Sequence, residues 1–231
     1  MEKIFGADVL QEAFDIIKTE IPLAIWETFY VTVLATAIAI AIGLPLGVVL
    51  VTGEKDGIRP IPKTVYGLIN VMINLLRSVP FLILMILVFP LTRLIVGTVV
   101  GTVASVVPLV IASFPFVARL VEGSMRELNQ NTVETAVSMG ASPFQVVTKV
   151  MIPESVPSLI SNFTIAVTTI LGYSAMSGIL GGGGLGKIAI NYGYYRYKYL
   201  VMIIAVVLLV ILVQLFQGIG SRLSAKCNKR L

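Results

Sequence analysis

The sequence predicts an all-α, polytopic integral membrane protein with five transmembrane helices per subunit and a short cytoplasmic coupling helix. Hydrophobic residues make up 57% of the 231-residue chain and charged residues only 13%, about half the usual share in soluble proteins. Mean hydropathy is +0.96. Four runs without a charge, at 28–53, 94–118, 155–186 and 199–221, are each long enough for the roughly 20 residues that a helix needs to cross a bilayer. A soluble core does not need this much apolar surface.

The N-terminal segment, residues 1–27, is expected to be extracytoplasmic and to lie at the membrane surface. It carries acids at Glu2, Asp8, Glu12, Asp15, Glu20 and Glu27, and bases at Lys3 and Lys18. Its apolar residues recur at roughly helical spacing, which is typical of an amphipathic helix in the interface. Because the segment lacks the basic start and compact apolar core of a cleaved signal peptide, we expect it to stay attached.

A transmembrane domain is expected over residues 28–221. The five spans are expected at 28–53, 63–93, 94–118, 155–186 and 199–221. The second is a bent segment that breaks near Ser78-Val79-Pro80, and a charge within a span costs roughly 2.5 to 3.5 kcal/mol, so Arg77 should face protein or water. In the third, Gly97 and Gly101 form a pair of small residues that permits close approach of helices.

Five spans place the two ends of the chain on opposite sides of the membrane. With the basic tail, residues 222–231, in the cytoplasm, the inside segments hold ten Lys and Arg and the outside segments six, the remaining one of the 17 being Arg77 within a span. This bias has the sign that the positive-inside rule requires. The N-terminus is therefore expected outside and the C-terminus inside.

Residues 134–153, ETAVSMGASPFQVVTKVMIP, form the cytoplasmic segment on which the functional interpretation depends. The pattern predicts two short helices joined by a corner. Gly140 suits the left-handed position after a helix, Ser142 an N-cap, and Pro143 the first position of the next helix. Pro153 is expected to end the second helix, with Ser155 capping the long segment that follows.

This segment has too few charges for an ordinary loop: Glu134 and Lys149 are its only charged residues. Exposed apolar patches usually mark partner sites, and an amphipathic helix in a partner's groove is a recurrent mode of docking. The alternative is a loop helix that folds back on its own chain. Composition alone does not separate the two interpretations.

The spacing of Glu134, Ala136, Gly140 and Ile152-Pro153 resembles the "EAA…G…I.LP" loop of permease subunits in ATP-binding-cassette importers. Thr135 and Met151 depart from the commonest residues of that loop. In the family, the loop forms a coupling helix that sits in a cleft of the ATPase subunit. The resemblance implies an ATPase-coupling set at Glu134, Ala136, Met139, Gly140, Ala141, Pro143, Ile152 and Pro153.

Over residues 20–225 the chain resembles permease subunits of bacterial methionine importers. The stretches that carry this resemblance are RSVPF at 77–81, TRLIVGT at 92–98, GYSAM at 172–176 and GGLG at 183–186. It implies import of methionine, in its D and L forms, across the inner membrane by a homodimer. The partners implied are two copies of a cytoplasmic ATPase, which would bind ATP and Mg, and an extracytoplasmic methionine-binding lipoprotein; this chain would bind no cofactor or metal. Another small solute is the alternative cargo.

Residues 181–188, GGGGLGKI, nearly match a phosphate-binding loop. Ile188 stands where that loop needs a hydroxyl for magnesium, and an apolar span precedes the glycines instead of a strand. We interpret the motif as an extracytoplasmic turn in which backbone packs closely, because glycine permits positive φ.

Residues 172–184 are the candidate outer end of the translocation pathway, because unwound backbone at membrane depth must be buried in protein or line a wet cavity. Tyr173, Ser174 and Ser177 offer hydrogen bonds to the polar ends of an amino acid, and Met176 offers a polarizable thioether to its side chain. The alternative is that Tyr173 and Met176 only pack a helix interface.

Several function classes lack the residues they need. The chain has no His, so it cannot build a Ser-His-Asp triad or a His-based zinc site. The uncharged runs hold no acid for a proton relay, and the basic residues are scattered rather than gathered for nucleic acid. An ATP-independent channel or secondary transporter remains an alternative, as does a membrane-embedded enzyme, although no nucleophile with a base beside it is visible.

Overall fold

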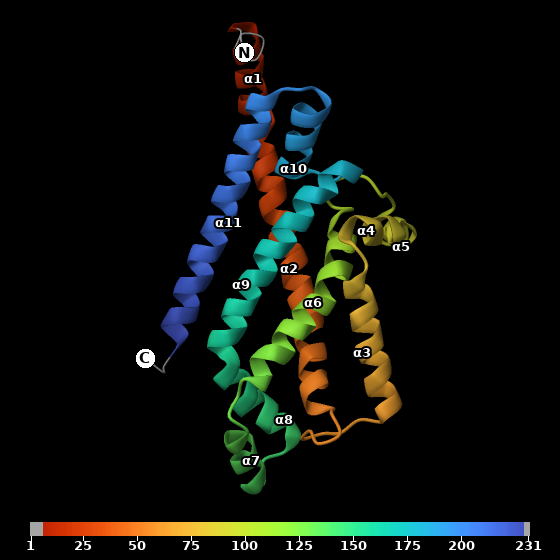
Figure 1. The fold of residues 1–231 in the computed structure, drawn as a ribbon, viewed down its shortest axis with the longest axis vertical. Helices are drawn as coiled ribbons and strands as arrows, with labels where there is room; N and C mark the ends of the chain where they lie inside the picture. Colours follow the sequence, from red (N-terminus) through yellow and green to blue (C-terminus); the bar gives the residue numbers. More distant parts are fainter. Residues whose placement is uncertain (1–6, 229–231) are drawn as a thin grey trace. The chain divides into compact units, whose positions relative to one another are not determined.

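The computed structural model describes residues 7–228 (Figure 1). These residues form two compact units. The first unit comprises residues 7–36, 80–110 and 167–216, and the second comprises residues 37–79, 111–166 and 217–228. Helices α2, α6, α9 and α11 each contribute a segment to both units. Lys229 and Arg230 of the expected basic tail, and Glu2 and Lys3 of the N-terminal segment, lie outside the described residues.

Within residues 7–228 every regular element is a helix. In chain order they are α1 Ala7–Thr19, α2 Ile21–Thr52, α3 Lys63–Ser78, α4 Phe81–Leu87, α5 Phe89–Val96, α6 Val106–Arg126, α7 Gln130–Ser138, α8 Pro143–Val146, η1 Val147–Met151, α9 Ile152–Ser177, η2 Gly178–Leu180, α10 Gly184–Ile188, η3 Ala189–Tyr195 and α11 Tyr199–Cys227. The prediction of an all-α fold is confirmed.

Four stretches of helix are long and apolar enough to cross a membrane: Ile21–Thr52, Thr102–Arg126, Pro143–Leu180 and Tyr199–Cys227. Helices α3 and α4 make a fifth span if the pair is counted as one broken segment. The predicted break near Ser78-Val79-Pro80 is confirmed, because α3 ends at Ser78 and α4 begins at Phe81. The expected count of five is therefore consistent with the structure.

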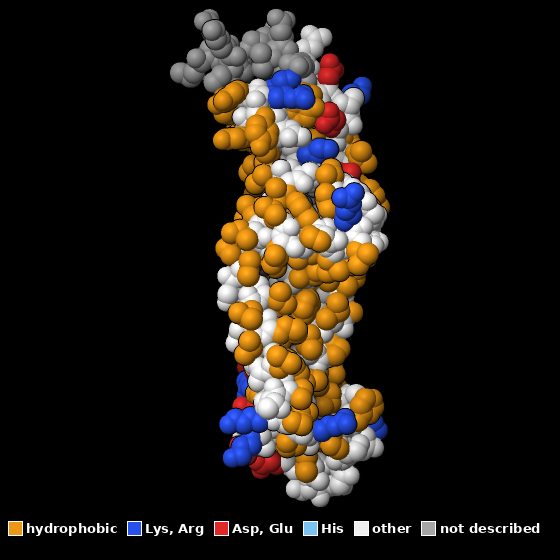
Figure 2. Space-filling view, turned by 90° about the vertical axis from the view of Figure 1, so that its right-hand side faces the viewer, with side chains coloured by type: hydrophobic (Ala, Val, Ile, Leu, Met, Phe, Trp, Pro, Cys, Tyr) orange, Lys and Arg blue, Asp and Glu red, His pale blue; other side chains and the backbone are white. Residues whose placement is uncertain are grey.

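The surface of the helices is largely apolar. On the face drawn in Figure 2, hydrophobic side chains cover most of the surface and charged side chains gather in a few groups. Large apolar residues such as Leu94, 82% exposed, and Leu68, 71% exposed, would be costly in water. A surface of this kind is expected where the protein contacts lipid or another subunit instead of water.

In the first unit, a core of buried residues joins α1, α2, α10 and α11. It consists of Ile16, Ile21, Ala24, Leu185, Ile188, Tyr192, Val201 and Ala205. At its edge the Tyr192 hydroxyl donates a hydrogen bond to the Glu20 carboxylate, and this bond raises the pKa of Tyr192. The aromatic segment 189–198 is thus anchored through Tyr192, while Tyr194, Tyr195 and Tyr197 are exposed.

In the second unit, glycines set the distance between α2 and α6. A Cβ on Gly43 would lie 2.8 Å from Val117 Cβ, and one on Gly47 would lie 2.6 Å from Val121 Cβ. Both are shorter than ordinary van der Waals contact, so no other residue fits without movement. Pro45, between these glycines, is accommodated inside α2.

The prediction that Gly97 and Gly101 let helices approach is wrong. Their φ angles of 85° and 111° place both in the left-handed region, and they lie in the connection between α5 and α6. The expected span at 94–118 is accordingly two elements: α5 ends at Val96, and α6 begins at Val106 and continues to Arg126. Charge spacing could not reveal this break because the whole stretch is uncharged.

Candidate functional site

The coupling segment, residues 130–153, has the corner that the sequence predicts. Helix α7 ends at Ser138, and Gly140 follows with a φ of 80°. Ser142 and Gln145 form a capping box: the Ser142 N–H donates to Gln145 Oε1 at 2.9 Å, and the Gln145 N–H donates to Ser142 Oγ at 3.4 Å. Pro143 occupies the first turn of α8. Each of these residue types meets a requirement of the backbone at its own position, so the corner could be predicted from the sequence.

The prediction that Pro153 ends the second helix is wrong. Helix continues from Pro143 to Leu180 through the π-turn η1. In that turn the Ile152 N–H donates to the Val147 carbonyl, five residues earlier. Such widening accommodates a residue that has no N–H and whose ring would crowd the preceding turn. Ser155 caps nothing; its hydroxyl donates to the Ser124 carbonyl at 3.5 Å.

The coupling segment buries one apolar face and exposes another. Val146 and Met151 are buried within the second unit, whereas Met139 is 83% and Phe144 75% exposed. Of the predicted coupling residues, Glu134, Met139, Gly140, Pro143 and Pro153 are exposed, and Ala136, Ala141 and Ile152 are half-buried. The segment folds partly onto its own chain, and the tip of its corner stays uncovered.

A charged network that the sequence analysis missed lies just before the coupling segment, on α6. The Arg119 guanidinium donates to Glu122 Oε2 at 2.7 Å and to Asn70 Oδ1 and Asn74 Oδ1 on α3 at 2.8 and 3.0 Å. Arg126 is 3.0 Å from Glu122 Oε1 and Arg126 Nη2 is 3.0 Å from Glu54 Oε2. Glu122 is buried, so two arginines neutralise the one carboxylate at the centre of the network. The i, i+3 and i+4 spacing of these residues on α6 was the available signal.

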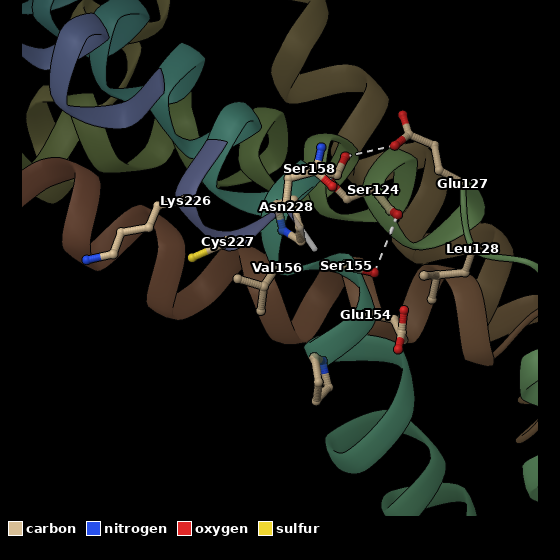
Figure 3. A pocket seen from close by; sticks show the side chains of 12 residues that line it. Ser124, Glu127, Leu128, Glu154, Ser155, Val156, Ser158, Lys226, Cys227 and Asn228 are labelled. Atoms are coloured by element: carbon tan, nitrogen blue, oxygen red, sulfur yellow. Dashed lines mark hydrogen bonds between the residues drawn. The ribbon is translucent and has the colours of Figure 1, made fainter. Parts of the chain in front are cut away.

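A second network joins the two ends of the coupling segment (Figure 3). The Ser158 hydroxyl on α9 donates to Glu127 Oε2 at 2.8 Å, and its oxygen lies 3.2 Å from Ser124 Oγ. Asn162 donates to Ser124 Oγ at 2.7 Å. Ser124, Glu127 and Ser158 line part of a pocket of about 870 Å³, whose other walls come from the start of α9 and from Lys226, Cys227 and Asn228 at the end of α11. The segment therefore leaves α6 and enters α9 at points that are hydrogen-bonded to each other.

Glu134 faces an open groove of about 830 Å³ in the second unit. The groove lies between α7 and the α2–α3 connection, and Glu54, Asp56 and Arg126 line it with Glu134. Within residues 7–228, no group of three or more His, Cys, Asp and Glu side chains is placed to hold a metal ion.

In the first unit, the predicted pathway residues lie near the end of α9. The Tyr173 ring stacks on Phe81, with centroids 4.7 Å apart, so the motifs RSVPF and GYSAM meet there. Ser174 and Ser177 are buried, and their hydroxyls donate to the carbonyls of Leu171 and Ser174 at 3.0 and 2.7 Å. Met176 is 46% exposed. The structure thus leaves the Met176 thioether accessible and engages both serine protons with the helix itself.

The glycine-rich loop binds a carboxylate of its own chain. The Gly184 N–H donates to Glu27 Oε2 at 2.7 Å, and Thr102 Oγ1 donates to Glu27 Oε1 at 2.8 Å. Gly181 and Gly184 have φ angles of 89° and 80°. A Cβ on Gly183 would overlap Thr102 Oγ1 and Glu27 Oε2. The interpretation of a closely packed turn is confirmed, and Glu27 lies within α2, which begins at Ile21 rather than at Thr28.

Comparison with known proteins shows which family has this architecture. Residues 43–223 match the family of binding-protein-dependent transport system inner membrane components. The chain belongs to this family. It is 45% identical over 210 residues to the probable D-methionine transport system permease protein MetI of Vibrio cholerae, covering 90% of this chain and 92% of that protein. The methionine import system permease protein MetP of Bacillus subtilis is 40% identical over 168 residues, 73% of this chain and 76% of that one.

A solved structure has the same fold as this permease. A chain from the inward-facing MetNI methionine ABC transporter is 41% identical, with a TM-score of 0.88 over 90% of this chain and 96% of that one. Membership makes this chain a non-catalytic, multi-pass membrane component of an ABC importer, which removes the enzyme and secondary-transporter alternatives.

The charged network on α6 predicts a specific loss of stability. Replacing Glu122 by Gln leaves two facing guanidinium groups without their shared carboxylate, which costs about 3 to 5 kcal/mol at a buried site. The thermal melting temperature of the detergent-purified permease should fall clearly for Glu122→Gln and stay unchanged for the exposed control Glu134→Gln. Equal melting temperatures for both variants would show that the network does not stabilise the second unit.

Proposed function

We propose that this permease forms the translocation pathway of an ATP-driven importer for methionine, in its D and L forms. The observation that carries the proposal is the likeness to methionine permeases along 90% of the chain, together with the coupling corner and the accessible Met176. The energy for uphill import comes from a separate ATPase, which the likeness to a chain of an ABC transporter supports.

The proposed assembly contains two copies of this chain and two copies of a cytoplasmic ATPase, which holds ATP and Mg. An extracytoplasmic lipoprotein delivers methionine. Residues 1–27 lie outside, residues 28–221 form the membrane domain, and residues 222–231 lie in the cytoplasm. The excess of Lys and Arg on the side of the coupling segment supports this orientation in the inner membrane.

We infer that the coupling segment transmits motion from the ATPase as a rigid unit. The exposed Met139 and Phe144 are suited to a partner's cleft. The segment continues without interruption into α9, which carries Tyr173 and Met176 near its other end. The serine network that ties α6 to α9 keeps the segment from swinging freely. A displacement of the corner is therefore passed along α9 rather than absorbed by a flexible loop.

Substitution of Gly140 tests this coupling. Gly140→Asp adds a charge at the corner, where a Cβ meets no atom of this chain within 4 Å but lies on a left-handed backbone with a φ of 80°. The part of its effect that exceeds the effect of Gly140→Ala should therefore fall on the partner's cleft. Methionine uptake by vesicles that hold the full importer should fall at least about tenfold, the effect of losing about 1.4 kcal/mol of interaction, while ATP hydrolysis continues.

Gly140→Ala is the matched control for Gly140→Asp. It imposes the same left-handed backbone on a residue with a Cβ but adds no charge, so most of the coupling should survive. Both variants should insert into the membrane in wild-type amounts. Normal uptake by Gly140→Asp would contradict the proposed role of the corner.

The pathway proposal assigns substrate recognition to the end of α9, with Tyr173, Ser174 and Ser177 beside Met176. The Met176 thioether is polarizable and contacts apolar side chains favourably. The oxygens of Ser174 and Ser177, whose protons are already donated, can accept a hydrogen bond from a substrate ammonium group once a movement of the pathway uncovers these buried side chains. This arrangement suits a small amino acid with an apolar side chain.

Uptake of labelled methionine tests both the function and the pathway. Vesicles that hold this permease, its cognate ATPase and the binding protein should accumulate methionine only with ATP. Met176→Ala should weaken methionine uptake or alter the preference among amino acids, whereas Met176→Leu, which conserves volume, should retain most of it. Uptake of a different small solute in place of methionine would contradict the assignment of methionine as the substrate. An unchanged preference among amino acids in Met176→Ala would show that Met176 only packs a helix interface.

A further inference from the structure

Three segments that lie far apart in the sequence meet at one carboxylate in the first unit. Glu27 belongs to α2, Thr102 to the connection between α5 and α6, and Gly184 to the start of α10. One oxygen of the Glu27 carboxylate accepts a hydrogen bond from Thr102, and the other accepts one from the Gly184 N–H. We call this arrangement the Glu27 clasp.

Two further contacts reinforce the clasp. Thr28, next to Glu27, accepts a hydrogen bond from the Leu185 N–H at 2.9 Å. The Gly101 N–H donates to the Gly181 carbonyl at 2.8 Å, which joins the two connections directly. All of these bonds run between segments, and none belongs to the regular bonding of a single helix. They can therefore break without unfolding any helix.

The glycines of residues 181–184 are required by this geometry. A Cβ on Gly182 would lie 2.6 Å from Ser177 Oγ, and a Cβ on Gly183 would overlap both Thr102 Oγ1 and Glu27 Oε2. The loop resembles a phosphate cradle in one respect, because the Gly184 N–H donates to an anion, which here is the Glu27 side chain. A carboxylate held by N–H and O–H donors forms stronger bonds than a neutral acceptor does.

We propose that Glu27 is a positioning residue that latches the outer connections of the permease, and that the clasp must open in each transport cycle. This inference rests on the proposed function, in which residues 172–184 form the outer end of the pathway. Ser177, at the end of α9, is tied to the same loop, because its carbonyl accepts from the Gly182 N–H at 3.0 Å. Opening the pathway outward separates these connections, so the clasp stabilises the state in which they are closed.

A latch of this kind has a measurable consequence for the ATPase. If ATP-driven closure of the ATPase is linked to outward opening, a weaker clasp raises the population of the open state even without the binding protein. ATP hydrolysis in the absence of binding protein should therefore rise. Loss of one charge-assisted hydrogen bond shifts such an equilibrium about tenfold.

The experiment compares three variants in the complete complex with its ATPase. Glu27→Gln keeps the shape but loses the charge, and Thr102→Val removes one donor while conserving volume. Thr98→Val is the matched control, because Thr98 lies in the same connection and bonds only to Val100 within it. Hydrolysis without binding protein should rise up to about tenfold in Glu27→Gln and Thr102→Val, and stay at the wild-type rate in Thr98→Val.

Assembly and melting temperature are measured for every variant, and Thr102→Val keeps the test valid if Glu27→Gln fails to fold. Unchanged hydrolysis in correctly assembled Glu27→Gln and Thr102→Val would overturn the latch and leave the clasp as a static support. This result differs from a failure of the proposed function, in which the wild-type complex itself shows no ATP-dependent uptake.

Discussion

Two carboxylates in the apolar helices, Glu27 and Glu122, find their partners within the protein, and this constraint sets where segments distant in sequence are joined. Lipid offers no hydrogen bonds, so each charge within or beside a span needs a local partner. On α6, Glu122 meets this need with Arg119 and Arg126. On α2, Glu27 meets it with the backbone of the glycine-rich loop and with Thr102. These satisfied charges lie where segments distant in sequence are joined.

The same constraint explains how the coupling segment can serve a transporter. Its apolar corner is small, with Met139 and Phe144 exposed. A force applied to the corner must therefore pass through the contacts that hold the two ends of the segment. Arg126 ties α6 to Glu54 in the α2–α3 connection, Arg119 ties α6 to Asn70 on α3, and the serine network around Ser124 ties α6 to α9. A corner fixed in this way moves together with the helices that it connects.

Much of the fold could be predicted because it follows from local rules. Composition was sufficient for the membrane class, and Gly140, Ser142 and Pro143 each meet a backbone requirement within a few residues of their own position. Pro153 was misread because a π-turn removes the clash that normally ends a helix. Gly97 and Gly101 were misinterpreted because residue spacing does not distinguish a helix face from a turn. The glycines that do let two helices approach closely, Gly43 and Gly47, flank a proline.

The candidate site was predictable only in part, for a different physical reason. The coupling corner is local, whereas the clasp joins Glu27 to residues 75 and 157 positions away, and no pattern along the chain reports such a pairing. Glu27 was grouped with the acids of the amphipathic N-terminal segment because its carboxylate gives no sign of a buried partner. The likeness to a phosphate-binding loop pointed to part of the right chemistry, since one glycine N–H, that of Gly184, donates to a carboxylate there.

The most direct test of the account is the affinity of this permease for its ATPase. The dissociation constant is measured in lipid nanodiscs for the wild-type chain and for the double variant Met139→Asp with Phe144→Asp, which places two charges on the exposed corner. The account predicts that the double variant binds the ATPase at least about tenfold more weakly, because buried anchors dominate such interfaces. An unchanged dissociation constant would contradict the claim that the coupling segment is the surface through which ATP drives transport.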